Sequence, residues 1–160
     1  MARALETVLL LFAASALYAA PPRYDGPRPP QPDLPYLLHA NNLIPTEKTV
    51  AREESGKGGV TYVINGSSSS ARTPLAEPIF IIQAQRLVPD RFGCFRMEVN
   101  KSGNREVAMA KRSRKDKPIP LKVTRLEEGL YKVEVDTPLE NGQYTLSPEG
   151  SNDAFAFEIY

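Results

Sequence analysis

Apolar and polar residues alternate with a period of two along most of the chain after residue 35. The run Ile79–Ile82 is instead continuously apolar, as in a strand that is covered on both faces. No segment of this region keeps the i, i+3, i+4 spacing of an amphipathic helix for more than a turn or two. The pattern therefore predicts an all-β fold whose clearest strands include these segments: 60–64, 79–82, 95–99, 107–109, 121–123, 131–135, 144–146 and 155–159.

Short turns are predicted between consecutive strands, which indicates that neighbouring strands are antiparallel. Asn65-Gly66 and Asn141-Gly142 are typical turn dipeptides, and 101–104 joins two strands as a hairpin. Shorter apolar pieces around 36–38 and 48–52 are candidates for further strands, and the expected total is seven to nine strands. The Gly- and Ser-rich segments 54–59 and 67–70 are expected to be flexible loops.

Residues 139–146, which read LENGQYTL, fit the pattern Leu-x-x-Gly-x-Tyr-x-Leu. This pattern resembles the tyrosine corner of immunoglobulin-like and fibronectin-like sandwiches, although the chain lacks the paired Cys and the Trp of antibody domains. The resemblance implies that the Tyr144 hydroxyl bonds to backbone a few residues upstream, at the start of the penultimate strand. We therefore expect an antiparallel immunoglobulin-like β-sandwich; an ordinary turn with a core Tyr is the alternative.

The first twenty residues have the pattern of a secretory signal peptide. Arg3 precedes an apolar run from Val8 to Ala14, and small residues follow it, with cleavage expected between Ala16 and Ala20. A membrane anchor is the alternative, but the run is shorter than the ~20 residues that cross a bilayer. The sequence therefore predicts an exported protein, either periplasmic or extracellular.

Residues 21–35 contain seven prolines and predict neither a helix nor a central strand. They form either an extended, polyproline-like spacer or a disordered leader. The expected organisation is a signal peptide over 1–20, a Pro-rich linker over 21–35 and one β-sandwich domain over 36–160.

Cys94 is the single cysteine, so an exported chain has no internal disulfide to stabilise it. Alternation places Cys94 on the face opposite Phe95, together with Arg96 and Glu98. Cys94 is therefore either an accessible thiol for pairing with another chain or a small buried hydrophobic residue.

Few residues offer catalytic or metal-binding chemistry. His39 is the single histidine, no second His or Cys lies close to it in sequence, and no Gly-x-Ser-x-Gly turn presents a nucleophile. We expect no catalytic site, no metal site and no cofactor.

The formal net charge of +1 is unevenly distributed. The segment 111–117 has five positive residues and one negative, whereas 126–160 has eight negative residues and one positive. The basic segment is either a solvated loop or a contact for an anionic surface or for the acidic region of another copy. Nucleic acid is the least favoured partner, because no aromatic residue lies between 101 and 125. The candidate contact residues are Lys111, Arg112, Arg114, Lys115 and Lys117.

These observations favour a noncatalytic exported binding or adaptor module that recognises a protein or glycan surface. One alternative is a self-assembling structural subunit that uses strand addition or contacts between the basic loop and an acidic face. A hydrolase of unknown substrate is the second alternative. The sequence does not identify the partner or the oligomeric state.

Overall fold

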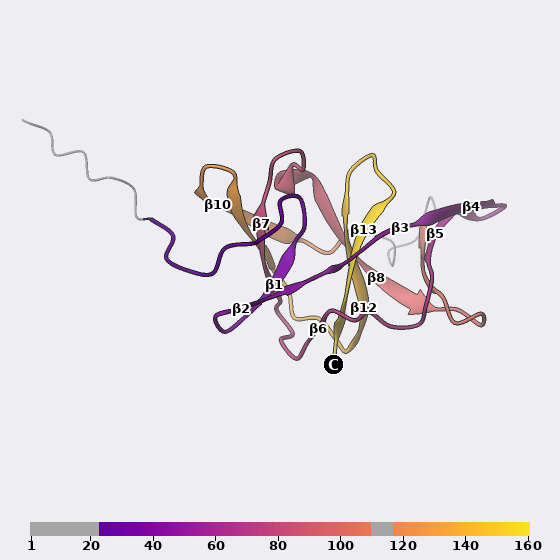
Figure 1. Ribbon diagram of the computed structural model, residues 1–160. Helices are drawn as coiled ribbons and strands as arrows, with labels where there is room; N and C mark the ends of the chain where they lie inside the picture. The colour runs from indigo at the N-terminus through magenta and orange to yellow at the C-terminus, as the bar shows by residue number, and fades with distance from the viewer. Residues whose placement is uncertain (1–22, 110–116) are drawn as a thin grey trace, which may run out of the picture.

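The computed structural model describes residues 23–109 and 117–160, and within them the chain is built from strands (Figure 1). The one helical turn found there is a 3₁₀ turn at Pro89–Arg91. The predicted all-β, antiparallel class is confirmed, and the predicted signal peptide lies outside the described residues. The thirteen strands are β1 (Tyr36–His39), β2 (Asn42–Pro45), β3 (Glu47–Val50), β4 (Arg52–Gly56), β5 (Gly59–Ile64), β6 (Arg72–Thr73), β7 (Ile79–Gln83), β8 (Phe92–Val99), β9 (Arg105–Met109), β10 (Leu121–Glu127), β11 (Leu130–Val135), β12 (Gly142–Pro148) and β13 (Asp153–Ile159).

The strands that were not predicted are short or strongly polar. β2 and β6 have four and two residues, and all five residues of β4 are exposed. Such segments carry too little apolar alternation to be recognised. Over residues 23–109 and 117–160 no helix has the length and the apolar character needed to span a membrane.

The first sheet has the order β10-β11-β7-β1-β2, and its neighbours are antiparallel. The continuously apolar β7 lies at its centre, and Phe80, Ile81 and Ile82 are fully buried. A strand covered on both faces was the expectation for this run, and the structure confirms it.

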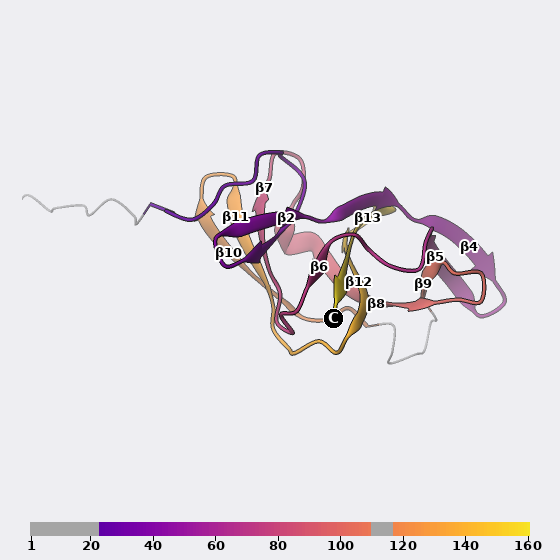
Figure 2. The same ribbon diagram turned by 60° about the horizontal axis from the view of Figure 1, so that its bottom comes forward.

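The second sheet has the order β3-β13-β12-β8-β9-β5-β4, and the short β6 pairs with β13 in parallel. It packs one face of β8, β12 and β13 against the first sheet, and Figure 2 shows the two sheets as neighbouring layers. An aromatic contact joins the layers: the Phe80 and Phe157 rings meet edge to face with 5.0 Å between their centres. Within the second sheet, Tyr144 stacks on Phe157 with 5.6 Å between the ring centres. The main core therefore lies between the sheets.

The second sheet curls back on itself, because β3 and β4 stand at its opposite ends and are separated by the single residue Ala51. β3 pairs with β13, the Ala51 N–H donates to the Asn152 carbonyl at 2.8 Å, and β4 then pairs with β5. In Figure 1 the same stretch of chain passes from β13 to β5. Ile64 of β5 and Ala156 of β13 consequently share a second apolar cluster inside the curl.

One end of the curl is closed by the side chain of Arg105, which is 1% exposed. Its guanidinium donates to both carboxylate oxygens of Glu47 on β3, at 2.9 and 2.7 Å. It also donates to the carbonyls of Gly66 and Asn65 after β5, both at 2.9 Å. A single buried cation thus joins three segments that are far apart in sequence, and each donated hydrogen bond is charge-assisted.

The end of the Pro-rich segment belongs to the folded domain. Asp33, Leu34 and Pro35 are buried, although the sequence placed them in the linker. The Asp33 carboxylate accepts hydrogen bonds from the backbone N–H groups of residues 85–87 at 2.9 to 3.0 Å, and its own N–H donates to the Gln83 carbonyl. These bonds place Asp33 over the loop that follows β7.

Two expected loops are structured in different ways. The segment 54–59 forms most of the β4–β5 hairpin, with its turn at 57–58. Within 67–70, Ser69 is buried: its hydroxyl donates to the Ala156 carbonyl at 3.1 Å, and its N–H donates to Gln143 Oε1 at 2.9 Å. Strand pairing in the first segment and long-range hydrogen bonds in the second therefore order residues whose composition suggested flexible loops.

We predict that Glu47→Gln lowers the free energy of unfolding by about 3 kcal/mol, because it leaves the buried Arg105 charge without its counter-ion. This is the low end of the range for a broken buried pair, since two carbonyls still accept from Arg105. Urea unfolding measures the effect. Glu54→Gln is the matched control: Glu54 and its partner Arg52 are each 55% exposed, so its cost is below about 0.5 kcal/mol. Equal costs for the two variants would contradict the assigned role of Arg105.

We predict an acid-sensitive contribution from Asp33. Burial raises the pKa of its carboxyl, but hydrogen bonds from three backbone N–H groups and Arg86 outweigh this, so the pKa falls from 3.8 to about 2. Because the folded pKa lies below the unfolded one, the stabilisation is complete above about pH 4 and is lost as the pH falls toward 2. Chemical unfolding of wild type and Asp33→Asn from pH 6 to 2 tests this. The stability difference should shrink across that window, and a constant difference would refute the assignment.

Candidate functional site

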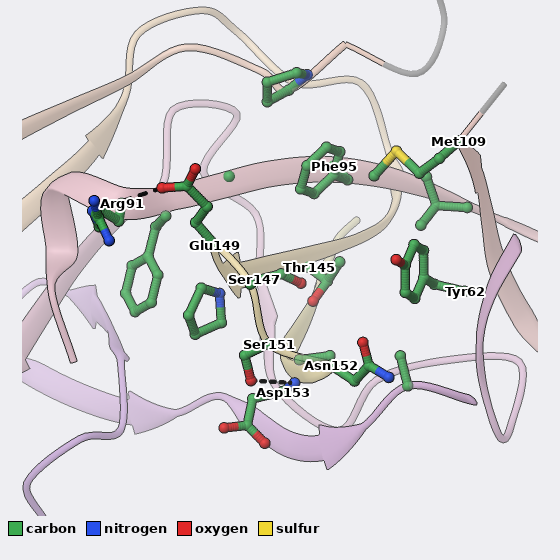
Figure 3. A pocket seen from close by; sticks show the side chains of 18 of the residues that line it. Tyr62, Arg91, Phe95, Met109, Thr145, Ser147, Glu149, Ser151, Asn152 and Asp153 are labelled. Atoms are coloured by element: carbon green, nitrogen blue, oxygen red, sulfur yellow. Dashed lines mark hydrogen bonds and ion pairs between the residues drawn. The ribbon is translucent and has the colours of Figure 1, made fainter. Parts of the chain in front are cut away.

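A cavity of about 420 Å³ opens at the end of the curled sheet opposite Arg105. Its walls come from β5, β8, β9, β12 and β13, from Asp90 and Arg91 before β8, and from the turn between β12 and β13. Figure 3 shows apolar side chains at one part of the cavity and polar ones at another. This size and this mixed lining are typical of small-ligand or side-chain binding sites.

The apolar walls follow from strand alternation in a sheet that is covered on both faces. On β13, Phe155 and Phe157 point into the main core, whereas Ala154 lines the cavity. On β8, Cys94 points into the core, and Phe95 and Met97 point into the cavity. Small residues on β13 and larger ones on the facing strands leave an open space between them. The apolar lining also includes Ala51, Tyr62, Ile64, Val107 and Met109.

The Phe95 ring owes its position to Gly93. A Cβ atom at residue 93 would lie 2.5 Å from Cε2 and 2.7 Å from Cζ of this ring, which is too close for two carbon atoms. The absence of a side chain lets the ring lie against the β8 backbone and leaves the cavity open.

The polar part of the cavity carries a net negative charge. Among the residues that the structure describes, its lining includes Asp90, Glu149 and Asp153 but a single cation, Arg91. Arg91 lies 3.7 Å from the Glu149 carboxylate, and both of these side chains are mostly exposed. The other two carboxylates have no ion-pair partner among the described residues. This acidic rim, Asp90, Glu149 and Asp153, favours a cationic group.

The structure corrects the proposal that Cys94 pairs with another chain. Its side chain is fully buried in the main core, and burial raises the pKa of the thiol to about 12. Alternation did place Cys94 opposite Phe95, but at this position the face that carries Cys94 packs into the main core, whereas Arg96 and Glu98 further along the same face are exposed. Cys94 is a small core residue in this fold.

Tyr144 makes the hydrogen bond that the tyrosine-corner resemblance implied. It lies near the start of β12, the penultimate strand, and its hydroxyl donates to the Glu140 carbonyl at 2.8 Å. The Arg96 guanidinium lies 5.8 Å from the ring centre and donates to the hydroxyl at 3.3 Å. Burial raises the pKa of Tyr144 above its ordinary value. The residue holds the β11–β12 connection against β8.

The basic segment falls mostly outside the described residues, since 110–116 are not described. Lys117 is described and exposed, and it precedes Pro118, which lines the cavity. Within the acidic C-terminal region most carboxylates outside the cavity form ion pairs with nearby cations. These pairs are Glu127–Arg28, Glu134–Lys132, Glu140–Arg96 and Glu158–Arg72.

The described residues offer no evident metal site. No group of three or more His, Cys, Asp or Glu side chains comes together in them. His39 lies at the end of β1, beside the tight turn to β2, and it is not among the residues that line the cavity. Of the sequence-predicted candidates that the structure describes, none lines the cavity; these are His39, Cys94, Lys117 and Tyr144.

The sequence analysis did not identify the cavity residues. Alternation of apolar and polar residues predicts a strand and separates its two faces, but it does not show what packs against the second face. One signal was present. Apolar residues occupy both parities of 154–157, and Phe95 and Met97 face away from the buried Cys94. A strand with apolar residues on both faces needs both faces covered, which indicates a second apolar cluster besides the main core.

We predict that Gly93→Ala pushes the Phe95 ring away from the β8 backbone and narrows the cavity. Aromatic ¹³C–¹H NMR spectra of the wild type and the variant should show a large shift of the Phe95 signals. Gly58→Ala is the control, because a Cβ at residue 58 meets no atom within 4 Å, and it should leave those signals in place. An unmoved Phe95 in Gly93→Ala would contradict the packing described above.

No protein-family model matches this chain, and searches of curated proteins and of solved structures return no match.

Proposed function

We propose that this protein is a noncatalytic, exported binding or adaptor module that recognises a protein or glycan partner through the cavity of the curled sheet. The observation that carries the proposal is the cavity itself, about 420 Å³ in volume, with apolar walls and an acidic rim. An open cavity of this kind gives a ligand apolar contact area and also polar groups that fix its orientation.

We also propose that the fold is an immunoglobulin-like sandwich with an insertion. In such sandwiches the strands A, B, E and D form one sheet, and C, F and G form the other, with C′ beside C in some members. Assigning A to β1, B to β7 and C to β8, and C′, D, E, F and G to β9 through β13, reproduces these neighbours in chain order. The hydrogen bond of Tyr144 at the start of strand F supports the same assignment.

Under this assignment, β2 to β6 form an insertion between strands A and B. Its β3 segment extends the second sheet beyond β13, and its β4–β5 hairpin extends it beyond β9. The insertion thus builds the curl and the cavity. A common scaffold with an added site fits a binding protein, because function resides in the added features more than in the fold.

One further observation favours binding over catalysis. The cavity lining contains neither His nor Cys, which are common general bases and nucleophiles. The buried Cys94 and the distant His39 are not available to it. His39, the residue on which the hydrolase hypothesis depends, is thus not part of the cavity lining.

Export remains part of the proposal because of the signal-like residues 1–20. A domain with one buried thiol and no internal disulfide depends on its core, and the charge-assisted bonds of Arg105 and Asp33 add to it. Such a domain keeps its fold in an oxidising or a reducing compartment.

Self-assembly is the second candidate, and the free edge of the first sheet favours it. β10 has seven residues, pairs with β11 on one side and has no strand on its other side among the described residues. Its unpaired N–H and C=O groups are a site where a strand of another copy can add. Light scattering behind a sizing column distinguishes this candidate: a dimer or larger species that survives high salt supports it, and a monomer at every concentration excludes it.

We predict that a screen on a glycan array and on a phage-displayed library of random linear heptapeptides finds selective ligands for the purified protein. Phe95→Glu should abolish their binding, because it places a charge on the apolar wall of the cavity. Leu75→Glu is the matched control, since Leu75 is 39% exposed and lies outside the cavity lining, and it should bind as wild type does. Circular dichroism confirms that both variants are folded. Ligands that bind Phe95→Glu unchanged, or no ligand in either library, would refute the proposal.

A further inference from the structure

We propose that the cavity binds an extended segment of a partner polypeptide, with a bulky apolar side chain against Phe95 and Met97 and a Lys or Arg side chain at the acidic rim. This inference rests on the proposed function and names the chemistry of the partner. It commits to a peptide, although the proposed function also allows a glycan.

The apolar requirement follows from the walls. Phe95 is partly exposed and Met97 is buried, and both face Ala154 and Ala51 across the space that small side chains leave open. Inserting a bulky apolar side chain here removes apolar surface from water on both partners, which favours binding. A saccharide gains less from this part of the cavity, because hydroxyl groups placed against the Phe95 and Met97 side chains would lose water without a hydrogen-bond partner there.

The polar requirement follows from the acidic rim. Among the described residues, three carboxylates line this part of the cavity against one cation, and that cation is 3.7 Å from Glu149. Within this described part of the chain, Asp90 and Asp153 have no ion-pair partner, so their charge favours a cationic group on a ligand. In Figure 3, Asp153 and Glu149 lie at the polar part of the cavity, away from Tyr62 and Met109. A ligand needs an apolar group and a cationic group at different points along its length.

The shape of the cavity favours a polypeptide over a compact amphiphile. The cavity opens to solvent at its polar part, where Arg91 and Glu149 are mostly exposed, so a ligand is not enclosed on all sides. An extended peptide meets this condition, because its successive side chains point to opposite faces and alternate ones remain in water. The lining also contains hydroxyl groups at Thr145, Ser147 and Ser151, which suit the polar backbone of such a peptide.

The heptapeptide library tests the proposal. Sequences enriched on the wild-type protein should combine bulky apolar residues with a nearby Lys or Arg. One enriched peptide is then synthesised with a fluorescent label, and a second version replaces its basic residue with uncharged norleucine. Fluorescence anisotropy at 50 mM and 500 mM NaCl gives the affinity of each peptide.

The variant that carries the test is the double substitution Asp90→Asn and Asp153→Asn, which removes charge from the rim without changing side-chain size. It should lower the affinity for the basic peptide about tenfold at low salt and much less at high salt, because charge contacts that are exposed to solvent are screened by salt. It should leave the norleucine peptide unchanged. The control Glu128→Gln with Asp136→Asn removes two exposed carboxylates outside the cavity lining and should change neither peptide.

The remaining outcomes overturn the inference in distinguishable ways. Enriched peptides without a basic residue, or equal binding by wild type and the rim variant, would show that the rim does not select a cation. If a glycan binds in a Phe95-dependent way and no peptide is enriched, the proposed function stands but the inference that the ligand is a peptide is refuted. No ligand in either library would refute both.

Discussion

The ion pair between Arg105 and Glu47 is the interaction on which the shape of the second sheet depends. Glu47 stands at the start of β3, which pairs with β13, and Arg105 stands at the start of β9, beyond β12 and β8 in the same sheet. A flat sheet would hold these residues far apart, since each strand adds about 4.8 Å. Within the curl, Nη2 of Arg105 lies 2.7 Å from Oε1 of Glu47. The Asn65 and Gly66 carbonyls accept further hydrogen bonds from the same guanidinium. A buried charge with so many partners disfavours opened arrangements of the sheet, because opening would leave it unpaired.

The curl also explains how one small domain contains both a core and a cavity. β8, β12 and β13 present one face to the first sheet and the other to the inside of the curl. Large aromatic residues such as Phe155 fill the first face, whereas Ala154 and Ala156 leave room at the second. The cavity is thus a consequence of side-chain size on strands that the rest of the fold already holds in place.

The sequence predicted the parts of this fold that depend on local pattern. The central β7, the hairpin of β8 and β9 and the closing strands all appear where alternation and turn dipeptides placed them. It did not predict the curl, because that depends on pairings between β3 and β13 and between β5 and β9, which are distant in sequence. It left the environment of Cys94 open for the same reason, since alternation separates two faces without saying whether both are covered. The cavity joins residues from Ala51 to Ala154, and no local window contains such a set.

A methyl–methyl NOE between Ile64 and Ala156 tests the curled sheet most directly. Three strands, β12, β8 and β9, separate the strands of these residues along the sheet, which places the residues about 19 Å apart if the sheet is flat. Inside the curl they belong to one apolar cluster with Met97. We expect cross-peaks within this cluster, linking the Ile64 methyls to those of Ala156 directly or through Met97. Cross-peaks confined to neighbouring strands would show an open sheet, and the cavity and the binding function derived from it would then be wrong.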